Sequence, residues 1–163
     1  MTERDFITQN IGPSVESSVE SRRLLDDPLF REGLLREIHG NSSIDVSGLL
    51  RRLLQIEIDY RRDSENGDYF ENLYWCAFLL WRIGDLNDVI NLWRAKNVNL
   101  DTACGFDIQF LVGAGVDETI RYLREKTDTE SQAALGYIME CKASGDFDGL
   151  QEWASQRSEY FGA

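Results

Sequence analysis

Hydrophobic residues recur at spacings of three and four along most of this chain, which is the spacing that places them on one face of a helix. Between Leu29 and His39, for example, apolar side chains stand at positions 29, 30, 34, 35 and 38. Asp27 and Pro28 come just before, and their residue types are favoured at the N-cap and first turn of a helix. No segment shows sustained alternation of apolar and polar residues. The pattern therefore predicts an all-α fold.

Turn-forming residues divide the rest of the chain into further amphipathic segments. The predicted helices are Leu29–His39, Val46–Asp63, Tyr69–Ile83, Leu86–Lys96, Asp101–Gly113, Val116–Lys126, Thr129–Ser144 and Phe147–Ser158. Tyr69–Ile83 is apolar around most of its circumference, which indicates a central position in the core. Residues 1–27 are polar, and we expect them to form a flexible N-terminal arm with a short helix near Val19–Leu25.

The C-terminal part of the chain repeats its own pattern. Segments that begin at Leu86, Val116 and Phe147 each follow a glycine turn and carry acidic residues in their first turn, at offsets of 30 and then 31 residues. Periods of this length are typical of helical hairpins that stack on one another. We therefore expect residues 28–163 to form one all-α domain of stacked antiparallel hairpins. The expected hairpin units are about 69–96, 101–126 and 129–158.

Residues 81–93 read WRIGDLNDVINLW. This segment resembles the turn of a HEAT-type repeat, in which a helix that ends in Gly-Asp leads into a second helix with apolar residues at similar spacing. The resemblance extends over residues 68–160 and implies a short α-solenoid. The alternative is an irregular helical bundle whose hairpins have similar lengths.

The net charge narrows the range of partners. The chain has 17 basic and 29 acidic residues and a formal charge of −12. Phosphates repel such a surface, so we expect neither nucleic-acid nor membrane binding. The longest apolar run, residues 73–81, is too short to span about 30 Å of hydrocarbon. Residues 1–6 do not resemble a signal peptide, and we expect a cytoplasmic protein whose three cysteines are free and buried.

Few residues are suited to catalysis or metal binding. His39 is the single histidine, and no two of Cys76, Cys104 and Cys141 have the close spacing with which one loop presents two zinc ligands. Gly113-Ala114-Gly115 follows a predicted helix and is interpreted as a turn. We therefore expect no catalytic residue, resident metal or cofactor.

Four arginines lie on one long predicted helix. Arg51 and Arg52 precede Arg61 and Arg62 by about three turns, so part of the set shares a face that is able to receive an acidic segment or phosphate. Glu57 stands four residues before Arg61 and Asp59 three before Arg62, which favours ion pairs within the helix instead. We expect the intrahelical pairs.

Asp107 and Gln109 are the least ordinary polar residues. They lie among apolar residues inside the predicted helix Asp101–Gly113, where Gly105 costs about 1 kcal/mol relative to alanine. One interpretation places both side chains on a concave binding surface, and another makes them buried partners of a neighbouring helix end. An alternative function is a small carboxylate and metal-dependent enzyme that uses Asp101 and Asp107.

The acidic charge is concentrated in the repeats. Residues 1–66 have a net charge of −4 and residues 67–163 a net charge of −8. If the hairpins stack in register, the acidic turns, including Asp128 and Glu130, form a ridge that attracts a basic partner. The alternative is that these acids only keep the protein soluble and stabilise the starts of their helices. The predicted partner-binding residues are Asp85, Asp88, Asp107, Gln109, Asp117, Glu118, Tyr122, Asp146, Asp148 and Trp153. Exposed Tyr69 is a further candidate.

Small size, acidity, helical hairpins and little catalytic chemistry together resemble the immunity proteins of bacterial toxin systems, including contact-dependent growth inhibition. This resemblance rests on general character and transfers no individual residue. It implies an inhibitor that covers the active site of a cognate toxin, often a basic nuclease. A helical-repeat adaptor or scaffold is the remaining alternative.

Overall fold

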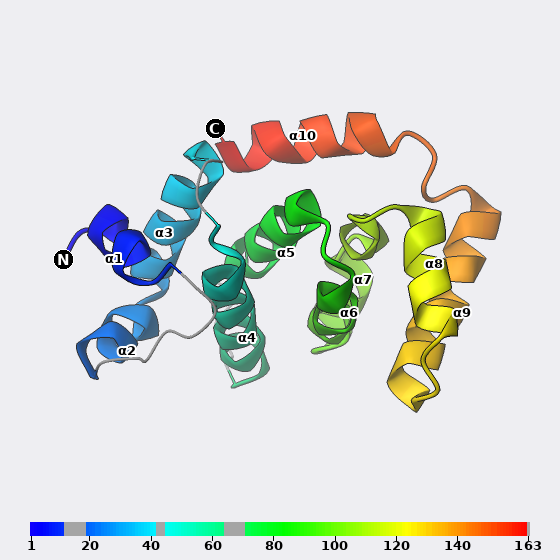
Figure 1. The fold of residues 1–163 in the computed structure, drawn as a ribbon, viewed down its shortest axis with the longest axis horizontal. Coiled ribbons are helices and arrows are strands. Elements are labelled where there is room, and N and C mark those ends of the chain that lie inside the picture. The colour runs from blue at the N-terminus through cyan, green and yellow to red at the C-terminus, as the bar shows by residue number, and fades with distance from the viewer. Residues whose placement is uncertain (12–18, 42–44, 64–70, 163) are drawn as a thin grey trace. The chain divides into compact units, whose positions relative to one another are not determined.

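A computed structural model describes residues 1–11, 19–41, 45–63 and 71–162, and every regular element within these ranges is a helix (Figure 1). The predicted all-α fold is therefore confirmed. The helices group into two compact units, Met1–Leu79 with Ser158–Ala163 and Leu80–Arg157. This division differs from the single domain expected over residues 28–163, because N-terminal helices also contribute to the first unit and two helices run from one unit into the other.

The first unit contains the N-terminal helices. Its elements are α1 (Glu3–Gln9), α2 (Val19–Asp26), α3 (Pro28–Gly40), α4 (Ser47–Asp63), most of α5 (Glu71–Ile83) and the end of α10 (Leu150–Gly162). The predicted start of α3 is confirmed: the Leu29 amide donates to the Asp27 carboxylate at 2.9 Å, and Pro28 occupies the first turn. Because proline has no N–H to leave unsatisfied, it fits this position.

The N-terminal helix α1 packs against α3. Thr2 and Asp5 cap α1 reciprocally, and Phe6 is 0% exposed with its ring packed edge-on against Phe30 of α3. One buried aromatic thus anchors a helix of mostly polar composition, and the flexible arm expected over residues 1–27 stays a prediction. The short helix expected near Val19–Leu25 is confirmed as α2. Residues 12–18 lie outside the described ranges.

A buried ion pair joins two helices of the first unit. Arg31 of α3 donates from Nε to the Glu57 carboxylate of α4 at 2.5 Å, and each residue is 1% exposed. Asn72 of α5 donates to the same carboxylate at 3.3 Å. The expected intrahelical pair of Arg62 with Asp59 is present at 3.1 Å, but the one expected between Glu57 and Arg61 is replaced by this contact across helices.

The second unit contains the repeated region. It comprises the end of α5, η1 (Leu86–Asp88), α6 (Val89–Lys96), α7 (Leu100–Gly105), η2 (Ile108–Val112), α8 (Val116–Arg124), α9 (Thr129–Ser144) and the first part of α10. The bounds of α9 match the prediction because Asp128 accepts the Ser131 amide at its start and Gly145 adopts a left-handed conformation at its end.

The predicted helix Asp101–Gly113 is interrupted. Helix α7 ends at Gly105, the backbone is extended at Phe106, and η2 begins two residues later. Lys96 of α6 is buried and its ammonium donates to the carbonyl oxygens of Ala103 and Phe106 at 2.7 and 2.8 Å. A lysine from a neighbouring helix thus satisfies carbonyls that a continuous helix would bond internally.

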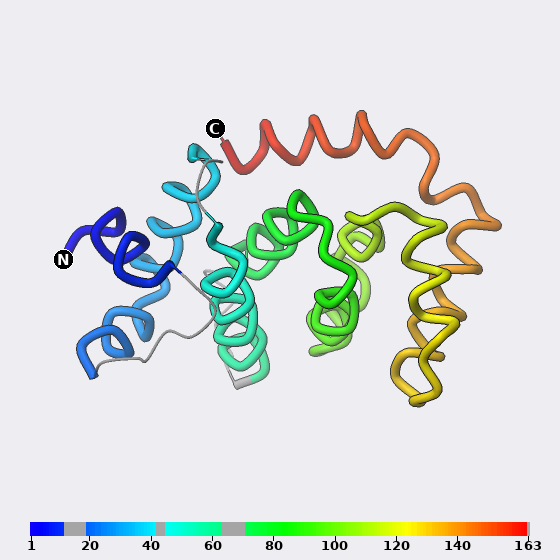
Figure 2. Tube along the Cα trace, in the orientation of Figure 1, coloured from blue at the N-terminus to red at the C-terminus, as the bar shows by residue number. Residues whose placement is uncertain are grey.

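Helices α8 and α9 form an antiparallel hairpin (Figure 2). Lys142 near the end of α9 pairs with Asp117 at the start of α8, while Gln132 near the start of α9 donates to the Lys126 carbonyl after α8. Helix α9 therefore packs on α8, whereas the expected unit 129–158 pairs it with the last helix. No helix in the described ranges is long and apolar enough to cross a membrane.

Candidate functional site

Three glycine turns lie next to one another at one end of the second unit. A side chain added to Gly84, which follows α5, would contact the carbonyl oxygen of Gly113, so these turns are adjacent. Gln109 of η2 donates to the backbone carbonyl of Asp146 at 2.7 Å, which places the turn after α9 beside the same edge. In Figure 2 the three turns lie at the upper end of this unit.

These turns bring acidic side chains to one edge. Asp117 and Glu118 begin α8, and Asp146 and Asp148 follow α9; all four are exposed. Asp85 is half-buried and accepts the Asn87 amide at 2.9 Å. We call these five residues the acidic edge.

The alignment of acids is incomplete. Asp88 is 2% exposed and therefore does not present a carboxylate to an external partner. An aspartate suits the first turn of a helix, so this residue type has a local explanation in the sequence. The spacing of apolar residues did not indicate that its side chain is buried. Asp128 and Glu130 lie at the start of α9, so the antiparallel hairpin places them at the opposite end, where Glu130 pairs with Arg94 of α6.

Asp107 holds α10 in place. Its carboxylate accepts from the Trp153 indole at 2.8 Å and from Nε of Arg157 at 2.8 Å. Trp153 is itself half-buried and packs edge-on against Trp81 and Phe110. Asp107 and Trp153 were predicted to bind a partner, but the structure uses both in internal contacts. The interpretation of Asp107 as the polar partner of a neighbouring helix is the one that the contacts favour.

Two more predicted residues make contacts within the unit. Gln109, as described above, bonds to the turn after α9. Tyr122 is half-buried, and the Lys126 ammonium lies 4.5 Å from its ring centroid. Tyr69 lies outside the described residues.

The two residues of the alternative catalytic pair have different surroundings. Asp107 is committed to Trp153 and Arg157, and Asp101 is exposed near the start of α7. Among the residues that the structure describes, no group of three His, Cys, Asp or Glu side chains is arranged to hold a metal ion. Cys76 and Cys141 are buried as expected, but Cys104 is exposed on α7.

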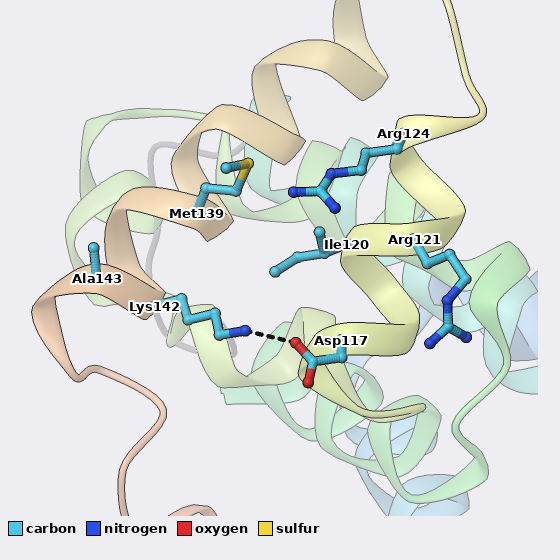
Figure 3. A pocket seen from close by; sticks show the side chains of 7 residues that line it. All are labelled: Asp117, Ile120, Arg121, Arg124, Met139, Lys142 and Ala143. Atoms are coloured by element: carbon cyan, nitrogen blue, oxygen red, sulfur yellow. Dashed lines mark hydrogen bonds and ion pairs between the residues drawn. The ribbon is translucent and has the colours of Figure 1, made fainter.

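An open groove of about 590 Å³ lies between α8 and α9 (Figure 3). Basic and apolar side chains dominate its lining. The residues that matter are Asp117, Ile120, Arg121 and Arg124 of α8, and Met139 and Lys142 of α9. Ile120 is nearly buried and forms the floor, whereas the Met139 side chain is 42% exposed.

The one acidic residue of the groove is paired. Lys142 donates to the Asp117 carboxylate at 2.6 Å, and this hydrogen bond holds the pKa of Asp117 below its usual value of 3.8. The Asp117 side chain is 70% exposed, so solvent weakens the attraction. The nearby charges of Arg121 and Arg124 lower this pKa further. Neither arginine has an ion-pair partner within 4 Å among the described residues.

Sequence reasoning missed this groove. Arg121 and Arg124 stand three residues apart on α8, which is a visible signal. Met139 and Lys142 are likewise three apart, but only the α8–α9 packing places them across the groove from Arg124. Comparisons with family models, with curated proteins and with solved structures found no match to this chain.

Proposed function

We propose that this chain is a protein-binding module whose acidic edge docks on a basic surface of a partner protein. The observation that carries the proposal is the adjacency of the three glycine turns. Because Gly84 lies against Gly113 and Gln109 bonds to Asp146, carboxylates from separate hairpins share one edge. Grouped exposed carboxylates of this kind steer a basic partner and speed association.

The role that fits best is inhibition of that partner, in the manner of an immunity protein. The charge of −12 and the four exposed acids Asp117, Glu118, Asp146 and Asp148 at one end of the second unit support a target whose own working surface is basic, such as a nuclease domain. Asp107 and Trp153 support the same role indirectly. Their hydrogen bond fastens the first part of α10 to the residue that precedes η2 in the same unit, and a preformed surface loses less entropy on binding.

The test begins with the full chain as bait in extracts of the cells that produce it. We expect it to retain a basic protein at low salt and to release it as NaCl is raised from 0.05 to 0.5 M. With the purified pair, the triple variant Asp117→Asn, Asp146→Asn, Asp148→Asn should weaken binding roughly three- to thirtyfold, because exposed charge contacts are individually modest.

The matched control is the triple variant Glu20→Gln, Asp26→Asn, Glu140→Gln, which removes three exposed acids elsewhere. It should bind like the parent chain. Equal weakening by both variants, or affinity that is independent of salt, would contradict docking at the acidic edge. Assay of the partner's activity separates the roles, since an inhibitor abolishes that activity and an adaptor leaves it intact.

A further inference from the structure

We propose that the groove between α8 and α9 binds an acidic peptide segment that carries one apolar side chain. This would be a second recognition surface, opposite in charge to the acidic edge. It is carried by different observations, so it stands or falls independently of the proposed function. The groove belongs to one hairpin of the second unit and is formed by residues of α8 and α9 alone.

Charge is the first argument. Two cations, Arg124 and Lys142, face the groove against one carboxylate, Asp117, in a chain with a net charge of −12. Asp117 is engaged with Lys142, so Arg124 contributes positive charge that no described carboxylate within 4 Å compensates. In Figure 3 the Arg124 guanidinium reaches toward Met139, whereas the Arg121 side chain points away from the groove on the far side of α8.

The apolar surface is the second argument. Ile120 lies between Arg124 at one end of the groove and the Asp117–Lys142 pair at the other, and Met139 faces the Arg124 guanidinium (Figure 3). Met139 is flexible and polarisable, and such side chains adapt to varied apolar groups. An exposed methionine beside a nearly buried isoleucine offers a contact for one aliphatic side chain.

The arrangement favours a peptide over a single small anion. A phosphate or sulfate is bound best where several donors converge on one point. Here Arg124 and Lys142 are separated by the apolar floor, and Arg121 points elsewhere. A peptide segment with acidic residues on both sides of an aliphatic one would place carboxylates near Arg124 and Lys142 and the aliphatic side chain on the apolar floor. The volume of about 590 Å³ also lies within the range of ligand sites.

The overall negative charge does not prevent this binding. At physiological ionic strength, exposed charges more than about 8 Å apart are largely screened, so distant carboxylates contribute little. Contacts made directly in the groove are short-ranged and survive that screening better. We therefore expect an acidic segment to bind weakly, with an affinity that depends on the residues of the groove rather than on the net charge.

The experiment is an NMR titration of the full chain with a short peptide of Asp and Glu around one central Leu. We expect shifts in the backbone amides of residues 120–124 and 139–143. Arg124→Gln should raise the dissociation constant about two- to fivefold, as for one exposed ion pair. Met139→Gln should weaken the binding of this peptide but not the binding of its Leu→Gly version.

Arg23→Gln is the matched control, because Arg23 is exposed on α2 and its loss changes the net charge equally. It should leave the dissociation constant unchanged. Three outcomes would overturn the proposal: no shift with the acidic peptide, equal shifts with a Lys-containing peptide of the same length, or displacement of the peptide by millimolar inorganic phosphate. The last result would identify a small-anion site instead.

Discussion

Arg31 and Glu57 show how much one buried contact decides in this protein. Arg31 also donates from Nη1 to the Leu25 carbonyl at 2.7 Å, and its guanidinium lies 5.1 Å from the centroid of the Tyr60 ring. Burial raises the pKa of Glu57, although the bonds from Arg31 and Asn72 oppose this. The carboxylate is stable in the interior because its partners are fixed there.

We expect Glu57→Gln to lower the free energy of unfolding by about 3–5 kcal/mol, because it leaves the charge of Arg31 buried without a counter-charge. The double variant Arg31→Met, Glu57→Leu should lose less free energy of unfolding than Glu57→Gln, since neither charge remains buried. Urea denaturation followed by circular dichroism measures both. A double variant that is less stable than Glu57→Gln would show that the pair contributes net stability beyond its desolvation.

Asp117 provides a pH-dependent prediction. Because Lys142 stabilises the charged carboxylate, its pKa lies below 3.8, and Lys142→Gln should raise it toward that value. Its contribution to stability is present above pH 3.8 and is lost as the pH falls through the folded-state pKa. Carboxyl ¹³C NMR measures the titration midpoint. A midpoint that does not move in the variant, and matches that of Arg23→Gln, would mean that Lys142 does not pair with Asp117 in solution.

At the scale of elements, two glycines of the second unit have opposite roles. A Cβ on Gly113 would lie 2.3 Å from the backbone oxygen of Trp81, a contact that side chains do not make. Gly136 is exposed within α9 and has nothing within 4 Å of the same position. One glycine therefore permits the turn after η2 to pack against the end of α5, whereas the other only weakens its helix.

We expect Gly113→Ala to destabilise the protein by about 1–3 kcal/mol through overpacking against backbone. Gly136→Ala should stabilise it by about 0.5–1 kcal/mol, because alanine loses less conformational freedom in a helix. Thermal and urea unfolding of the two variants give the comparison. A neutral Gly113→Ala would imply that the two turns separate without cost.

Sequence prediction succeeded for elements whose ends are encoded locally. The start of α3 at Pro28 and the whole of α9 follow from an aspartate cap at one end or a left-handed glycine at the other. It failed for the segment Asp101–Gly113. There the interruption depends on hydrogen bonds from Lys96, which belongs to another helix. The last helix begins at Leu150 rather than Phe147, because Gly149 has a φ of 74° and belongs to the preceding turn.

At the scale of the whole molecule, the charge of −12 is distributed unevenly. Asp117, Glu118, Asp146 and Asp148 are exposed at one end of the second unit, whereas the groove beside them has an excess of cations. The net charge alone favoured a basic partner and gave no indication of a basic groove. The two surfaces meet at Asp117, and they call for partner segments of opposite charge.

The sequence by itself determined the helical class, most of the caps and glycine turns, and the uneven charge. Those properties depend on residues within a few positions of one another. Tertiary structure decided that Asp88 is buried, that Asp107 and Trp153 bind each other, and that Met139 and Lys142 face Arg124. Burial and pairing depend on which distant segments pack together, and periodicity along one helix does not specify that.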